Sequence, residues 1–230
     1  MATGFSMWQR TCRVGWGAVI VMVAIILLTC VGYSRAAGIV ATVTDEPGKP
    51  LPEAVVTVVP EGDTPMPPSF APTLATAIID QRDETFVPEV VVIHAGGSVQ
   101  FRNSDRTRHH VYSFSPIKQF EFVQNPHELS PPVRFDIPGS AAIGCNIHDN
   151  MIAYVYVTTA PWAAVTDQTG RAVIADLPAG HFIATVWHPR LRASAKPPSM
   201  SIVLASQDTT LAVTIPVRPP RRLRSHDSLY

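Results

Sequence analysis

The chain has 230 residues, of which 46% are hydrophobic and 16% are charged, and its formal net charge is zero. This composition supports a packed core, argues against a disordered chain and shows no basic excess that would indicate nucleic-acid binding. The 22 prolines favour short strands and loops over long helices.

The first 36 residues are expected to direct the chain out of the cytoplasm. Arg10 and Arg13 precede an apolar run over residues 14–33, and Ser34-Arg35-Ala36 offers small residues where a signal peptidase cleaves. An apolar helix of about 20 residues also spans a bilayer, so this segment is either a signal peptide or an N-terminal membrane anchor. Both readings predict a periplasmic or otherwise extracytoplasmic location. Without this segment the chain has 15 basic and 18 acidic residues, a formal charge of −3.

From residue 38 onward, the sequence predicts short strands separated by turns. The expected strands cover 39–44, 54–59, 75–81, 86–94, 98–103, 111–114, 133–137 and 152–157, with further strands after 161 that include 201–204 and 210–215. Residues 116–133 look irregular, and the segment 60–72, rich in Pro, Gly and Ser, marks a boundary. Such a series of strands is typical of an all-β sandwich fold. The basic tail, 218–230, has no periodicity and is expected to be disordered.

One cysteine remains once the export segment is set aside. Cys12 and Cys30 belong to that segment, which leaves Cys145 alone. Exported proteins normally pair their cysteines in disulfides. A lone thiol in such a protein is therefore buried and inert, reactive, or bound to a metal.

The residues around Cys145 favour the metal. Cys145-x2-His148-x2-Met151 puts a thiol, an imidazole and a thioether within seven residues, and copper prefers such donors. A further histidine is needed, and either His109 or His110 could supply it. Methionine is a poor zinc ligand, and a binuclear copper centre would need a second cysteine. The alternatives are a packed cysteine, a surface-loop histidine and a core methionine.

The segment from about 75 to 158 resembles the plastocyanin/azurin, or cupredoxin, family. The matching text is Phe86-x-Pro88, Gly97-x-Val99-x-Phe101-x-Asn103-x-Asp105, His109-His110-Val111, Pro138-Gly139 and Cys145-x2-His148-x2-Met151. The resemblance implies a Greek-key sandwich over 67–161 that holds one type 1 copper per chain. In the family the ligand histidine is followed by Asn. Aligned in this way, the resemblance implies that His110 stands where the family has Asn. It therefore implies that the ligands are His109, Cys145, His148 and Met151.

The flanking segments, 38–66 and 162–217, together resemble the carboxypeptidase-regulatory-like domain, a transthyretin-like β-sandwich. The matching text includes Pro50-Leu51-Pro-Glu-Ala54 and Thr166-Asp167-x-x-Gly170. The order of these segments implies that the cupredoxin is inserted into a loop of this second sandwich. The whole arrangement resembles exported proteins labelled methylamine-utilisation or plastocyanin-like.

These resemblances imply a one-electron carrier with an unidentified redox partner protein, and not an enzyme. Two other functions remain open. The chain could be a periplasmic copper-binding or storage module, or a structural β-module without a redox role.

Overall fold

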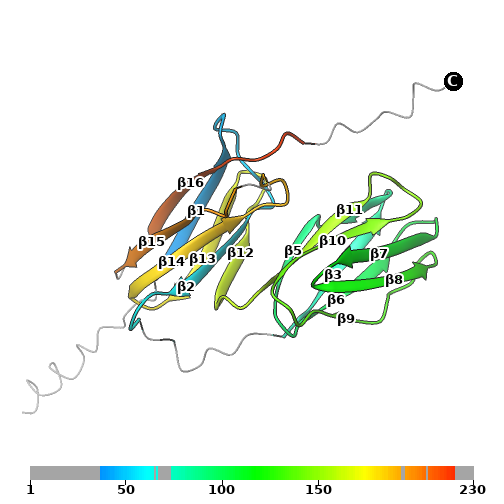
Figure 1. Ribbon diagram of the computed structural model, residues 1–230, viewed down its shortest axis with the longest axis horizontal. Helices are drawn as coiled ribbons and strands as arrows, with labels where there is room; N and C mark the ends of the chain where they lie inside the picture. Colours follow the sequence, from blue (N-terminus) through cyan, green and yellow to red (C-terminus); the bar gives the residue numbers. More distant parts are fainter. Residues whose placement is uncertain (1–36, 65, 67–73, 193–194, 206, 221–230) are drawn as a thin grey trace, which may run out of the picture. The chain divides into compact units, whose positions relative to one another are not determined.

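The computed structural model describes residues 37–64, 66, 74–192, 195–205 and 207–220. The predicted export segment and residues 221–230 of the predicted disordered tail lie outside these ranges. Over the described residues the chain forms sixteen strands and no helix (Figure 1). The all-β prediction is therefore confirmed. Within the same residues, no helix has the length and hydropathy needed to cross a membrane.

The middle of the chain forms two sheets. The five-stranded sheet has the order β5 (Val90–His94), β11 (Ile152–Thr158), β10 (Gly139–Cys145), β7 (His109–Ser115), β8 (Lys118–Gln124). The four-stranded sheet has the order β4 (Thr85–Val87), β3 (Thr76–Arg82), β6 (Ser98–Asn103), β9 (Val133–Arg134). Two pairs, β5 with β11 and β3 with β6, are parallel, and the other pairs are antiparallel.

Alternation along the strands builds the core of this part of the chain. In β6, Val99 and Phe101 are buried, whereas the side chain of Arg102 is exposed. The ring of Phe101 contacts the rings of Phe86, Phe120 and Phe122. Truncating a buried phenylalanine to alanine costs about 3–5 kcal/mol. The same core contains Cys145 and Met151, so the predicted metal loop is anchored in it.

Four strand expectations in this region were inaccurate. The strand expected over 86–94 is two strands, β4 and β5, which lie in different sheets. Residues 116–133 include the regular strand β8, whose Phe120 and Phe122 pack against the core. The strand expected over 133–137 ends at Arg134, although Phe135 remains fully buried. Strand β10 was not foreseen, because Gly139 and the small residues after it suggest a turn.

The flanking segments form two further sheets with their own buried core. One has the order β13 (Arg171–Leu177), β1 (Ala37–Asp45), β16 (Thr209–Ile215). The other has the order β12 (Trp162–Val165), β2 (Val55–Pro60), β14 (Gly180–Trp187), β15 (Ser199–Leu204). Thus β1 and β2 each lie between strands that follow them by more than 100 residues (Figure 1).

Candidate metal centre

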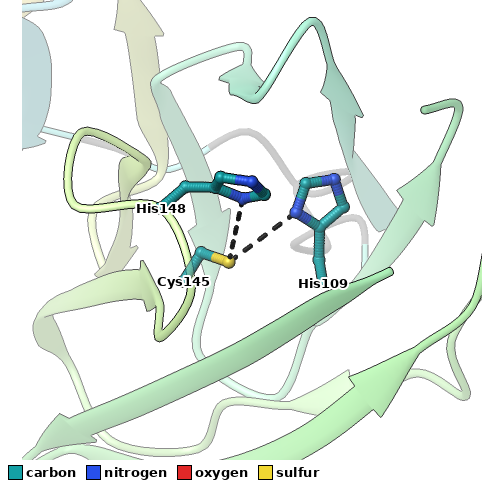
Figure 2. Close-up of side chains that lie close together, drawn as sticks. All are labelled: His109, Cys145 and His148. Atoms are coloured by element: carbon teal, nitrogen blue, oxygen red, sulfur yellow. Dashed lines mark hydrogen bonds between the residues drawn. The ribbon is translucent and has the colours of Figure 1, made fainter. Parts of the chain in front are cut away.

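Three side chains converge at one end of the five-stranded sheet. The sulfur of Cys145 lies 3.7 Å from Nδ1 of His109 and 3.8 Å from Nδ1 of His148 (Figure 2). The three donor atoms all lie within 4.8 Å of one another. One ion could therefore contact a thiolate and two imidazole nitrogens with little rearrangement of the chain.

His109 is the buried imidazole of this group. It is the first residue of β7, and its side chain has no exposed surface. Its Nε2 lies 2.9 Å from Oδ2 of Asp105. A carboxylate at Nε2 favours the tautomer that carries its proton there, which leaves the Nδ1 lone pair facing Cys145.

His110 points away from the group. Successive residues of a strand face opposite sides of the sheet, so the two neighbouring histidines cannot both face inward. The His110 side chain is partly exposed, and its Nε2 lies 3.9 Å from a carboxylate oxygen of Glu121. Its backbone carbonyl accepts a hydrogen bond from the N–H of Asn146. The backbone of His110, and not its imidazole, thus links β7, which carries His109, to the loop that carries His148.

The loop after β10 is closed by backbone hydrogen bonds. The N–H of Cys145 donates to the carbonyl of Met151, and the N–H of Met151 donates to the carbonyl of His148. This tight closure turns His148 back toward the sulfur three residues before it. Met151 is buried in the same core as Cys145. All four predicted ligand residues therefore lie in this region, and three of them form the compact donor group.

His148 is the most exposed of the three donors. Its side chain is 21% exposed, and its ring centroid lies 5.0 Å from that of His109. The Nε2 atom of His148 lies 3.4 Å from Oε1 of Glu84, which belongs to the turn between β3 and β4. The imidazole of His148 is therefore the part of the group nearest to solvent.

Asp105 joins the buried histidine to that turn. Its carboxylate accepts hydrogen bonds from the backbone N–H groups of Asp83 and Glu84, in addition to the contact with His109. Burial raises the pKa of Asp105, but the hydrogen bonds from Glu84, His109 and Asp83 outweigh it and lower the pKa below its ordinary value. Asp105 is therefore ionised at neutral pH.

Asn103 holds the loop that leads to His109. It is fully buried, its amide donates to the carbonyls of Thr107 and Asn125, and its oxygen accepts from the N–H of Asp105. The sequence drew attention to Asn103 and Asp105 only through the family resemblance, and it gave no sign of the contact between Glu84 and His148. That contact depends on a turn more than 60 residues away in the chain.

The donor set suits copper. Thiolate and imidazole, with a thioether residue buried beside them, are soft and borderline donors of the kind that copper selects. A site for Mg²⁺ or Ca²⁺ would instead present several oxygen ligands. Among the described residues, Cys145 is the one free cysteine, and it is buried.

The other histidines do not join the group. His188 accepts a hydrogen bond from the N–H of Arg190, and its Nε2 lies 3.2 Å from the carbonyl oxygen of Pro52. Burial and the neighbouring Arg190 lower its pKa to about 4, so it is neutral at pH 7. His188 directly follows β14, which belongs to the flanking sheets. Of the described metal-binding side chains, only His109, Cys145 and His148 form a cluster of three or more His, Cys or acidic residues.

The sequence matches no family model and no curated protein. Solved structures share part of the fold. The chain is similar to a purple cupredoxin from Nitrosopumilus maritimus (20% identity, 36% of this chain and 99% of that one, TM-score 0.33). It is also similar to amicyanin from Paracoccus versutus (20% identity, 44% and 98%, TM-score 0.33).

A third similar structure is a copper-containing nitrite reductase from Thermus scotoductus (23% identity, 36% of this chain, TM-score 0.32). The chain spans only 22% of the length of that enzyme. TM-scores this low carry no weight for function, so the metal assignment depends on the side-chain geometry described above.

Proposed function

We propose that this protein is an exported, mononuclear type 1 copper protein that carries one electron at a time. The observation that supports this most strongly is the placement of two imidazole Nδ1 atoms within 3.8 Å of the single sulfur of Cys145. Copper bound there would supply a Cu(I)/Cu(II) couple. His109, Cys145 and His148 would hold it, with Met151 as a weak fourth ligand.

The chain's own residues fit this role. Strands β7 and β10 pair at Val111 and Cys145, so the buried histidine and the thiol are held by one sheet ladder. Asp105 and Asn103 fix the loop before His109. A donor set held rigidly in this way changes little in geometry between oxidation states, which keeps the barrier to electron transfer low. His148, at the solvent side, would pass the electron to a partner protein.

The remaining parts of the proposal concern location and architecture. Residues 1–36 would export the chain, as a cleaved signal or a membrane anchor, to the periplasm or another extracytoplasmic space. The sheets that contain β1 and β2 would form a carboxypeptidase-regulatory-like sandwich into which the copper domain is inserted. The separation of the buried side chains into two clusters supports this division.

Electrochemistry of the copper-loaded protein tests the carrier role. We expect one copper per chain, a reversible one-electron wave and fast self-exchange. A protein that binds one copper tightly but shows no reversible wave would act as a copper-binding module. A protein whose biological role is unaffected by removal of the copper would be a structural module. Either result would contradict the proposal.

A further inference from the structure

The turn between β3 and β4 has a conformation that one of its two residues, Glu84, rarely adopts. Asp83 and Glu84 have φ values of 52° and 53°, both in the left-handed region. Two successive residues there form a type I′ turn, in which Gly, Asn and Asp predominate, so Asp83 suits the turn and Glu84 does not. A glutamate in this conformation is unfavourable and persists only where the surroundings fix it.

Asp105 supplies the interaction that fixes the turn. One of its carboxylate oxygens accepts from the N–H of Asp83 at 2.6 Å, and the other accepts from the N–H of Glu84 at 3.1 Å. Hydrogen bonds to an ionised acceptor are about twice as strong as neutral ones. The same carboxylate contacts Nε2 of His109. The turn is thus attached to the loop that leads to the buried imidazole.

This β-turn also places the carboxylate of Glu84 beside the imidazole of His148. Oε1 of Glu84 lies 3.4 Å from Nε2 of His148, although the Glu84 side chain is 58% exposed. Each imidazole of the donor group therefore has its Nδ1 toward Cys145 and its Nε2 toward a carboxylate. A carboxylate at the outer nitrogen fixes the ring orientation and raises the basicity of the ligating nitrogen.

We infer that Glu84 is a positioning residue for His148, held in place by the Asp105-bound turn, and that it makes the copper site favour Cu(II). This inference rests on the proposed copper function. A more basic imidazole binds Cu(II) more strongly, and the added negative charge favours the ion with the higher charge. Loss of a carboxylate that contacts the outer nitrogen of a ligand histidine typically lowers metal affinity about 10–100-fold.

The test compares Glu84→Gln with Asp83→Asn in the full chain. Both variants remove one negative charge from the same turn, but only Glu84 contacts His148. We expect Glu84→Gln to weaken Cu(II) binding at least about tenfold relative to Cu(I), which raises the reduction potential by about 59 mV for one electron. We expect Asp83→Asn to cause a clearly smaller rise. An unchanged potential in Glu84→Gln, or equal rises in both variants, would overturn the inference.

A measurement without metal separates this inference from the copper function. In the metal-free protein, the nitrogen-15 shifts of the His148 ring report the contact of its Nε2 with Glu84, and Glu84→Ala should change them. Asp83→Asn, which suits the positive φ of this position, should leave them at the wild-type values. If Glu84→Ala leaves the shifts unchanged, the contact with His148 does not form in solution and the inference fails. If the shifts change as expected but the wild type binds no copper, the proposed copper function fails and the positioning contact stands.

Discussion

Nδ1 of His109 faces the sulfur of Cys145 at 3.7 Å, whereas the ring of the next residue, His110, faces outward to Glu121. The pleat of β7 determines which ring faces inward, because only one of two adjacent residues can point into the sandwich. The doubled histidine therefore has two separable roles, which substitutions can distinguish.

We expect His109→Ala to abolish the proposed copper site, because it removes a donor and leaves Asp105 without its imidazole partner. His110→Ala should retain the site, since the link from the backbone of His110 to Asn146 does not need the imidazole. Visible absorption of the two copper-loaded variants checks this. Loss of the site in His110→Ala, with retention in His109→Ala, would place the ligand one residue later.

The carboxyl groups of Glu53 and Glu89 lead to a second prediction, which concerns how the stability of the folded protein depends on pH. Glu53, at a positive φ of 65°, has its pKa raised from an ordinary value of 4.5 to about 7. Burial is the main cause, followed by the nearby charge of Glu89 and a hydrogen bond shared with it, while the charge of Arg190 acts in the opposite direction. The folded protein thus holds a proton that the unfolded chain has already released between these pH values.

For a carboxyl group whose pKa is raised on folding, increasing pH therefore costs stability between about pH 4.5 and 7. We expect Glu53→Gln, which keeps a donor for Glu89, to melt at a higher temperature than wild type above pH 7. A rise of about 2–4 °C corresponds to about 1 kcal/mol for a chain of this size, a modest effect because solvent screens this partly exposed pair.

Melting curves from pH 4.5 to 8 check this expectation. The difference between Glu53→Gln and wild type should be near zero at the acid end and should reach a plateau above pH 7. Glu61→Gln, on the same flanking segment, serves as the control for a general change in net charge. Parallel curves for Glu53→Gln and wild type would contradict the assigned pKa.

The chain's two buried cores lead to a prediction about fragments. A fragment of residues 70–160 contains all nine strands from β3 to β11 and should fold and bind copper. A fragment of residues 162–230 lacks β1 and β2, the strands that lie between β13 and β16 and between β12 and β14. Each of its sheets would lose an interior partner, so it should not fold. Circular dichroism and thermal melting of each fragment test this. A cooperative melt of 162–230 would refute the proposed insertion.

The sequence predicted β6, whose alternation is strong, and missed β10, whose signal is weak. Strand β6, with Val99 and Phe101 alternating with polar residues, was predicted with its observed bounds, Ser98–Asn103. Strand β10 has mainly small residues, so its inward side chains, Ala141 and Ile143, carry little periodic signal. The alternation of Phe120 and Phe122 in β8 was present in the sequence and was overlooked.

The candidate site likewise contains residues that the sequence could identify and contacts that it could not. Cys145, His148 and Met151 could be identified because one loop carries all three at fixed spacing. Neither the carboxylate of Asp105 nor that of Glu84 could be assigned a partner from spacing. Asp105 reaches back 21 residues to the N–H of Glu84, and Glu84 reaches forward 64 residues to His148. The pairing of β3 with β6 and of β7 with β10 brings together the ends of the strands that carry these groups.

The visible spectrum of the copper-loaded protein, recorded for wild type and for Cys145→Ser, tests the central claim most directly. The full chain should be reconstituted anaerobically with one equivalent of copper and then oxidised. A thiolate bound to Cu(II) should give wild type an intense charge-transfer band and a type 1 electron-spin spectrum, and the Cys145→Ser variant should lack both. A wild-type protein that binds one copper per chain but stays colourless would show that Cys145 is not a ligand, and it would contradict the electron-carrier account.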